Sequence, residues 1–203
     1  MILNGYVSVY LFLFALMLEK SSEAGNLMLT ELEGAVLGIV ARKQPLTAYA
    51  IRKEFESAVT QSWSASAGAI YPLVRRLLDG GLLTETSKQD DGRGTILLRM
   101  SPTGRARLID WVRAGDLKTL GPAADPMRTR GFALSELPLE DRRSVLHDWQ
   151  AITERSIELA RSQIARFDQE HDHTAALATR GTQLQLEARL QWIDEMIERM
   201  SAR

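Results

Sequence analysis

The side chains of this 203-residue chain that best suit binding chemistry lie in one segment, residues 63–83, which reads WSASAGAIYPLVRRLLDGGLL. At 100° per residue, a helix over residues 67–79 gathers large apolar side chains on one face. Small, polar and basic residues lie on or beside the opposite face. The apolar face holds Ile70, Leu73, Val74 and Leu77, and the other holds Gly68, Tyr71, Pro72, Arg75 and Arg76. The spacing therefore predicts a helix that packs through one face and presents the other to a ligand.

The two ends of this helix suit contact with a nucleic acid. Ser66 can cap the first turn, and the small residues Ala67 and Gly68 let backbone N–H groups approach a phosphate or a base edge closely. Gly80 and Gly81 supply the left-handed residue that ends a helix. These features are typical of a helix that enters a DNA groove, and an ordinary amphipathic helix is the alternative. The candidate DNA contacts are Ser64, Ser66, Ala67 and Gly68 for close approach, and Tyr71, Pro72 and Arg75 for the DNA backbone.

Pro72 is expected six positions into this helix. A proline there removes one amide donor and crowds the carbonyl group four residues back, at a cost of about 3 kcal/mol in an ordinary helix. That carbonyl belongs to Gly68. Because a glycine peptide tilts easily, the pair predicts a bend where the helix begins.

Two short helices are predicted before this segment. Thr30 and Glu33 have the spacing of a capping box, which predicts a helix over residues 31–42. A proline ends it, and Thr47 can cap a second amphipathic helix that contains Tyr49. Thr47 and Tyr49 are therefore added to the candidate DNA contacts.

A hairpin is predicted after the double glycine. Extended segments flank the turn QDDGRG, in which Asp91, Gly92 and Gly94 can supply positive φ and Arg93 projects from the tip. Arg93 is the last candidate DNA contact. A serine and a proline at 101–102 then open a further helix.

Three helices followed by a two-stranded wing define a winged helix-turn-helix, here over residues 30–113. In this arrangement the third helix reads the major groove, and the wing tip lies against the DNA backbone or the minor groove. This region has 12 Lys and Arg against 9 Asp and Glu, whereas residues 114–203 have 12 against 15. The basic excess therefore lies with the predicted reading helix, although the whole chain has a net charge of −1.

The remainder of the chain predicts a linker and a helical domain. Two glycines and two prolines mark residues 114–126 as a linker. Residues 127–203 then predict two antiparallel helices joined near 170–181, and the second has apolar residues in a four-three-four-three spacing, typical of a coiled-coil seam. Since two helices alone bury only part of their apolar faces, we expect a homodimer, with reading helices about 34 Å apart over a palindromic site. The candidate dimerisation residues are Trp149, Ile152, Leu186, Leu190, Ile193 and Ile197.

An apolar extension forms residues 1–29. The run from Tyr6 to Leu18 is too short to span a bilayer, and it lacks the basic start and small-residue cleavage site of a signal peptide. Three interpretations stay open: a start assigned too far upstream with Met28 as the true start, an accessory helix, and a membrane anchor. No membrane-spanning segment is expected.

Three stretches of the chain together resemble the PadR family of bacterial transcriptional regulators. They are G-A-I-Y-P-L-V-R-R-L in the reading helix, T-A-Y-A-I-R around Tyr49, and G-R-G-T-I-L-L-R-M-S-P-T-G-R after the turn. The resemblance implies a winged helix that binds operator DNA, usually to repress a gene, and a tail that pairs two subunits. It also implies a cavity at the dimer interface, lined by Trp111 and Trp149, for an aromatic or amphipathic small-molecule effector, and core packing is the alternative role of these two residues. The wing departs from the family pattern at residues 95–98, where aromatic and basic residues are usual.

The sequence therefore predicts a mainly α protein: a sequence-specific, DNA-binding transcriptional regulator, a homodimeric repressor relieved by a small-molecule effector. The alternative is a winged-helix module that binds protein through Tyr71 and Arg75. Enzymatic activity is not expected, because the chain has no cysteine, no phosphate-binding glycine loop and three histidines, all in the tail. His171-Asp172-His173 is read as a polar turn, and we expect neither a metal nor a cofactor. The lack of cysteine fits a reducing cytoplasm, where we expect the protein to work.

Overall fold

The computed structural model describes residues 28–58, 66–90 and 93–200. These residues are mainly helical and include one two-stranded sheet, and the expected mainly α fold with a winged helix-turn-helix is confirmed. Backbone contacts divide the chain into two compact units. Of the described residues, 28–54, 67–90 and 93–116 belong to the first unit, and 55–58, 66 and 117–200 belong to the second. The domain bounds 30–113 and 127–203, with a linker over 114–126, stay our proposal.

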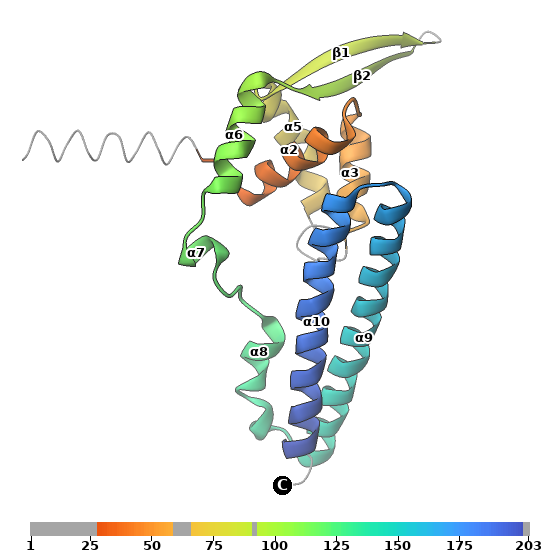
Figure 1. Ribbon diagram of the computed structural model, residues 1–203. Helices are drawn as coiled ribbons and strands as arrows, with labels where there is room; N and C mark the ends of the chain where they lie inside the picture. Colours follow the sequence, from red (N-terminus) through yellow and green to blue (C-terminus); the bar gives the residue numbers. More distant parts are fainter. Residues whose placement is uncertain (1–27, 59–65, 91–92, 201–203) are drawn as a thin grey trace, which may run out of the picture. The chain divides into compact units, whose positions relative to one another are not determined.

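The helices and strands of the winged helix follow the predicted order (Figure 1). The helices are α2 (Glu31–Lys43), α3 (Ala48–Glu56), the short 3-10 helix η1 (Ser66–Ala69), α5 (Ile70–Asp79) and α6 (Pro102–Arg113). The strands are β1 (Leu83–Asp90) and β2 (Arg93–Met100), which pair antiparallel.

Local hydrogen bonds explain where three of these helices begin. The Glu33 N–H donates to Thr30 Oγ1 and the Thr30 N–H donates to Glu33 Oε2, which completes the predicted capping box of α2. The Ala50 N–H donates to Thr47 Oγ1 at the start of α3, at 3.1 Å. Ser101 Oγ accepts the N–H of Gly104 at 2.9 Å, and Pro102 follows as the first residue of α6.

Helix α5 packs through the face that the sequence predicted. Its four large apolar side chains are at most 5% exposed, and they are Ile70, Leu73, Val74 and Leu77. Each buried side chain of this size stabilises the fold by about 1.5–3 kcal/mol. The helix ends in a Schellman motif: the Leu82 N–H donates to Leu77 O, the Gly81 N–H donates to Leu78 O, and Gly81 has φ of 68°.

The start of this helix corrects the expectation for Pro72. The α-helix begins at Ile70, after the 3-10 turn, so Pro72 is its third residue rather than a residue deep in the helix. The first-turn N–H groups of an α-helix have no intrahelical acceptor, so a proline costs little there. The expected 3 kcal/mol penalty is therefore wrong, and the bend at the start of the helix stays a prediction. The N-cap of α5 is Ala69, which makes no side-chain cap, so the expected Ser66 cap of this α-helix is also wrong.

The connection between α2 and α3 is tied to the wing. The Leu98 N–H donates to Leu46 O at 2.8 Å, and the Leu46 N–H donates to Leu98 O at 3.3 Å. The Met100 N–H donates to Gln44 Oε1 at 2.8 Å. Since these bonds join the base of the hairpin to the helices, the wing has a fixed attachment to the helices of its own unit.

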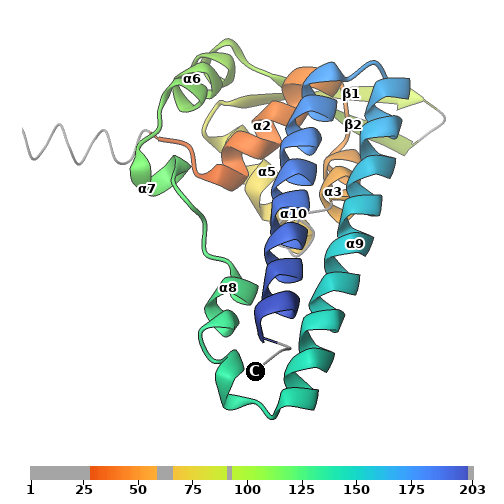
Figure 2. The same cartoon turned by 60° about the horizontal axis from the view of Figure 1, so that its bottom comes forward.

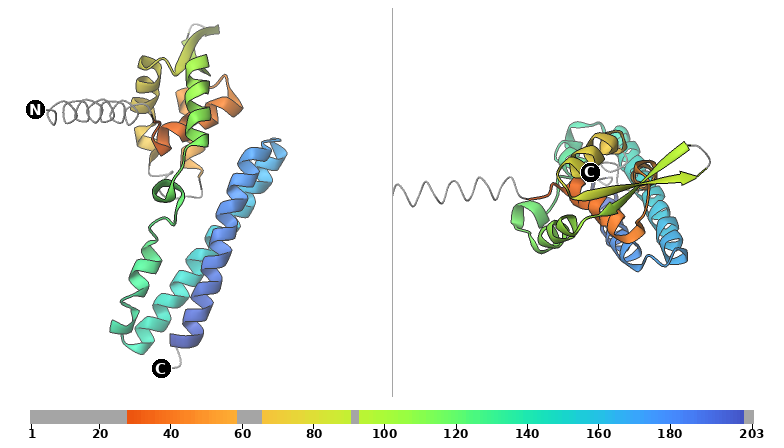
Figure 3. Two further views of the ribbon diagram at one scale, coloured as in Figure 1. Left: turned by 60° about the vertical axis from the view of Figure 1, so that its left-hand side comes forward. Right: turned by 90° about the horizontal axis from the view of Figure 1, so that it is seen from above.

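The hairpin itself is long and regular (Figure 3). Asp90 pairs with Arg93, and residues 91–92 between them lie outside the described residues, so the tight turn predicted there stays a prediction. Gly94 lies within β2 opposite Gln89, and the expectation that it forms part of the turn is wrong. The pairing continues without interruption, and this register uses Gly94 as a strand residue.

The second unit is built on two long antiparallel helices, α9 (Leu139–Gln169) and α10 (His173–Met200), which lie side by side (Figures 1 and 2). Before them come α7 (Leu117–Leu120), α8 (Pro126–Gly131) and the 3-10 helix η2 (Leu134–Glu136). The largest buried cluster of this unit contains Leu134, Leu146, Trp149 and Ile193. A helix pair with α8 and η2 packed against it therefore forms one core.

The turn between the two long helices is shorter than expected. It consists of residues 170–172 rather than 170–181, because Asp172 caps α10 by accepting the Ala175 N–H at 3.1 Å. His171 adopts φ of 56°, and the Asp172 N–H donates to Phe167 O, which ends α9 in a Schellman motif. The His-Asp-His sequence thus has a structural role in ending one helix and starting the next. Within the described residues, no three His, Cys, Asp or Glu side chains come together as a metal site would require.

None of the helices in residues 28–58, 66–90 and 93–200 is both long and apolar enough to cross a membrane.

Candidate nucleic-acid interface

The start of the reading helix presents an unobstructed glycine. Gly68 is exposed, and a Cβ built on it would meet no atom within 4 Å. Packing inside the protein therefore gives no reason for a glycine here, although glycine costs about 0.5–1 kcal/mol relative to alanine in a helix. A ligand that approaches the backbone from outside would give such a reason.

The exposed face of α5 continues from this glycine. Tyr71 is 47% exposed, and Pro72, Arg75 and Arg76 are exposed beside it. Within the described residues, the Arg75 guanidinium makes no hydrogen bond or ion pair. Exposed arginines and a tyrosine hydroxyl on one helix face can donate to phosphate oxygens.

The start of α3 adds a second polar surface in the same unit. Tyr49 is 55% exposed, and Lys53 Nζ lies 5.5 Å from the centre of its ring. Thr47 is half-buried and its hydroxyl oxygen is engaged as the helix cap. Lys53 is not among the residues predicted from the sequence, although its position four residues after Tyr49 on a helix indicates that the two side chains can meet.

A half-buried ion pair fixes α3 against α2. Lys43 Nζ lies 2.7 Å from Glu54 Oε1, and the two side chains are 24% and 18% exposed. This pair joins the last turn of α2 to the last turn of α3. The ion pair thereby fixes the position of α3 against α2, and with it the position of the exposed face of α3.

Several predicted contacts lie partly or wholly outside the described residues. Ser64 belongs to the segment 59–65, which the structure does not describe. The backbone of Ser66 and Ala67 forms η1, and the backbone of Arg93 begins β2, while the side chains of these residues are not described. Their roles in DNA binding stay predictions.

The residues predicted to pair two subunits have different positions. Trp149, Leu186 and Ile193 are at most 8% exposed and pack within the helix pair of their own chain. Leu190 and Ile197 pack against the same clusters. Among the six candidates, only Ile152 is strongly exposed, at 55%. The coiled-coil seam therefore joins α9 to α10 within one chain.

The two tryptophans predicted to bind an effector both take part in packing. The Trp111 ring lies against Gly34, so that a Cβ on that glycine would be 2.5 Å from Trp111 Cε2. Trp149 lies in the core of the second unit. Packing accounts for both positions, and the effector role of this pair stays a prediction.

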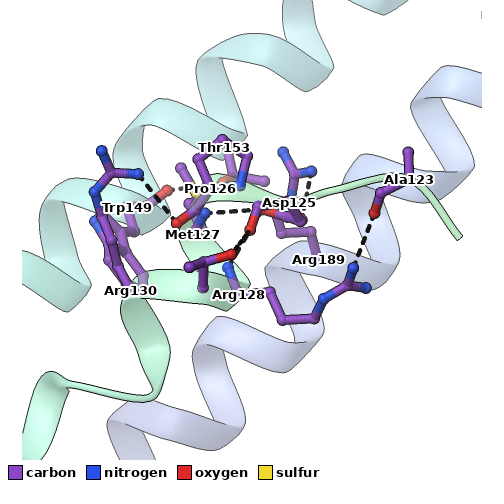
Figure 4. A network of polar contacts seen from close by, with 10 residues as sticks. Ala123, Asp125, Pro126, Met127, Arg128, Arg130, Trp149, Thr153 and Arg189 are labelled. Carbon is purple, nitrogen blue, oxygen red and sulfur yellow. Dashed lines mark hydrogen bonds and ion pairs between the residues drawn. The ribbon is translucent and has the colours of Figure 1, made fainter.

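A polar network holds α8 to α10 in the second unit (Figure 4). Asp125 accepts the Met127 N–H at 2.9 Å and the Arg128 N–H at 3.3 Å, and its second carboxylate oxygen lies 2.8 Å from Arg189 Nη2. Burial alone would raise the pKa of Asp125. The two backbone N–H groups and the Arg189 guanidinium outweigh burial, and they hold the pKa of this carboxyl below its usual value.

Comparison with known proteins places this arrangement in a family. Residues 36–110 match the model of the transcriptional regulator PadR-like family. A curated relative, the negative transcriptional regulator PadR of Bacillus subtilis (strain 168), is 33% identical over 82 residues, which are 40% of this chain and 44% of the relative. The match thus spans less than half the length of that relative.

Solved structures share the fold over most of the chain. The structure of Bacillus subtilis PadR in complex with operator DNA has a TM-score of 0.72 at 18% identity and covers 84% of this chain and 99% of its own. The structure of the same Bacillus subtilis protein in complex with p-coumaric acid has a TM-score of 0.66 at 19% identity, and the match covers 83% of this chain and 94% of that one. The structure of the PadR-like transcriptional regulator BC1756 from Bacillus cereus has a TM-score of 0.67 at 16% identity, and the match covers 85% of this chain and 97% of that one. The family-model match and the curated relative agree with the motifs of the reading helix and wing, and residues 36–110 are a domain that matches the PadR-like family of transcriptional regulators.

Proposed function

We propose that this chain is a sequence-specific, double-stranded-DNA-binding transcriptional regulator that acts as a homodimer and without catalysis. The observation that carries the proposal is the division of α5, whose apolar face is at most 5% exposed while its other face is exposed from Gly68 to Arg76. A rigid helix with a free polar face is what major-groove reading requires. The solved complex of the Bacillus subtilis relative with operator DNA supports the same use of this fold.

Each part of the exposed surface has a role in this proposal. The backbone at Gly68, with Ser64, Ser66 and Ala67 before it, approaches base edges. Tyr71, Arg75 and Arg76 contact phosphates on the walls of the groove, as do Tyr49 and Lys53 at the start of α3. Arg93 at the wing tip contacts the DNA backbone or the minor groove.

The second subunit is a second copy of this chain, bound through exposed apolar residues of the long helices. Ile152 and Leu159 lie seven residues apart on α9 and are 55% and 52% exposed. Leu177 and Leu184 lie seven residues apart on α10 and are 73% and 50% exposed. Residues seven apart share one helix face, so each helix has an apolar stripe that its own partner helix leaves uncovered. These four residues replace the buried seam as our proposed subunit contacts, and Ile152 is kept from the original set.

The regulator represses in this proposal, and an aromatic small molecule relieves repression. The curated relative is a negative regulator, and a solved structure of the Bacillus subtilis relative contains p-coumaric acid. Both facts support the expectation without giving the effector of this chain.

The experiment that tests the proposal is capture of genomic DNA fragments on the purified full chain, followed by sequencing. We expect enriched fragments that share an inverted repeat, with half-sites about one DNA turn apart, and that include the promoter region of the chain's own gene. A variant with Tyr71→Phe, Arg75→Gln and Arg76→Gln should lose the enrichment. Fragments without any shared sequence, recovered equally by this variant, would contradict specific DNA binding and favour a protein-binding module.

A further inference from the structure

One face of the wing is only partly covered by the helices. The register places Leu83, Glu85, Ile96 and Leu98 on the same face of the hairpin, because Glu85 lies directly opposite Leu98 and side chains two residues apart share a face. Leu83 and Leu98, at the base, are 2% and 1% exposed. Ile96, one step further out on that face, is 54% exposed. The inner face of the hairpin is therefore buried at its base and open further out.

An open groove of about 860 Å³ lies where this face leaves α5. Its apolar lining comes from α5, from the hairpin and from the start of α3, and consists of Val74, Leu78, Leu83, Ile96, Leu98 and Ala48. A volume of this size is in the range of sites for organic molecules of drug size. All of these residues belong to the first unit.

The charged side chains that line the groove are Arg75, Asp79 and Glu85. Within the described residues, none of the three makes a hydrogen bond or an ion pair. Two of the three are carboxylates, and Glu85 projects from the face that also carries three apolar residues. Both carboxylates are exposed, and with Arg75 they give the lining of the groove a net charge of −1, which attracts a cation. The Tyr71 ring, which also lines the groove, can add a cation–π contact.

We propose that this groove is a binding site for a small organic cation with an apolar, aromatic body. The body lies against Leu78 and Ile96, and the charge lies near Asp79 and Glu85. The site is distinct from the effector position predicted at Trp111 and Trp149. Its occupant is a small molecule because the groove has a limited volume.

Occupancy of the groove has a consequence for DNA binding, and this part rests on the proposed function. Tyr71 and Arg75 line the groove and also belong to the exposed face of α5. A cation bound against Tyr71 occupies space and adds positive charge where the phosphates of DNA are proposed to lie. The two ligands therefore compete.

Tetraphenylphosphonium is a suitable test ligand, because it is an aromatic cation that donates no hydrogen bond. Calorimetric titration of the full chain should show saturable binding with one site per chain. Combined Asp79→Asn and Glu85→Gln substitution should weaken it at least about tenfold, and Ile96→Ser should weaken it without changing the charge. The matched control is Asp110→Asn, an exposed carboxyl of α6 outside the groove, which should leave the affinity unchanged. The aromatic anion 8-anilinonaphthalene-1-sulfonate should bind more weakly than the cation.

Three results would overturn the proposal: no saturable binding of tetraphenylphosphonium, binding that the paired substitution leaves unchanged, or tighter binding of the anion. The competition is measured separately, as the rise in the apparent Kd for a DNA fragment from the capture experiment when tetraphenylphosphonium is added. Tetramethylammonium at the same concentration is the ionic control. Saturable cation binding by a chain that binds no DNA would refute the proposed function and leave the groove site standing. DNA binding without saturable cation binding would refute the groove site and leave the proposed function standing.

Discussion

The indole ring of Trp111 lies directly over Gly34, where α6 crosses α2. A Cβ built on Gly34 would come within 2.5 Å of Trp111 Cε2, closer than two carbon atoms can approach. The missing side chain of Gly34 is thus what admits the tryptophan. This contact joins the helix after the wing to the first helix of the winged domain.

Gly34→Ala should therefore destabilise the protein. Forcing an extra carbon into a packed contact costs about 1–3 kcal/mol, which a urea denaturation curve measures as a lower free energy of unfolding. Gly38→Ala is the matched control on the same helix, because its Cβ would lie 4.0 Å from the nearest atom, Arg42 Nη1. The control should be neutral or stabilising by up to about 1 kcal/mol. Equal effects of the two substitutions would contradict the close contact.

Gly68→Ala should separate stability from DNA binding. The open space around this position means that the free energy of unfolding should be unchanged or slightly higher. The added methyl group would instead obstruct close approach of DNA, and we expect a loss of affinity of about tenfold or more, measured by fluorescence anisotropy. Gly181→Ala on α10 has equally open space and should leave DNA affinity unaltered. Wild-type affinity in the Gly68 variant would remove this residue from the proposed interface.

The Asp125–Arg189 pair should make stability depend on pH in the acidic range. The pKa of Asp125 is lower in the folded protein than the usual pKa of an aspartate side chain, because the backbone N–H groups of Met127 and Arg128 and the Arg189 guanidinium outweigh burial. The stabilisation is therefore present above about pH 4 and is lost as pH falls below it. Since both side chains are partly exposed, at 33% for Arg189 and 19% for Asp125, the pair contributes at most about 1 kcal/mol.

Urea unfolding of wild type and Asp125→Asn at pH 7 and pH 3 tests this dependence. The difference in free energy of unfolding should be larger at pH 7 and should shrink at pH 3. Asp148→Asn, at an exposed position on α9, is the control, and its free energy of unfolding should differ little from that of wild type at either pH. A difference for Asp125→Asn that is the same at both pH values would show that the charge of Asp125 contributes nothing.

The proposed subunit contacts predict different effects of substituting exposed and buried apolar residues: the first should change the oligomeric state and the second the stability. Ile152→Glu with Leu184→Glu should convert the dimer to a folded monomer, because both side chains are at least half exposed within one chain. Leu186→Ala, which removes a side chain that is 8% exposed, should instead lower stability by about 2–5 kcal/mol. Light scattering measures the mass and circular dichroism measures the melting. A double variant that stays dimeric would contradict the proposed surface.

Local signals in the sequence predicted much of the fold. The buried face of α5, the capping box at Thr30 and the Ser101-Pro102 start of α6 each depend on residues within one or two turns. The α-helical start at Ile70 was missed, because helical periodicity does not distinguish a 3-10 turn from an α-helix. The short turn before α10 was missed because His171 takes a conformation that is more usual for glycine.

Contacts between distant residues were not predictable from pattern alone. Asp125 and Arg189 lie 64 residues apart, and no local spacing indicates their pairing. The seam of α10 was correctly identified as apolar, but the sequence did not show whether it faces α9 or a second chain. Its burial within one chain follows from the length of α9, whose 31 residues are enough to cover it.

The salt dependence of DNA binding tests the central claim most directly. If two subunits each neutralise about three phosphates, the logarithm of the binding constant should fall against the logarithm of salt concentration with a slope near −5. The measurement is fluorescence anisotropy with a fragment from the capture experiment, from about 50 to 200 mM salt. Arg75→Gln should reduce the size of the slope by about 2, one phosphate per subunit. A slope near zero, or one that Arg75→Gln leaves unchanged, would contradict binding of DNA through the exposed face of α5.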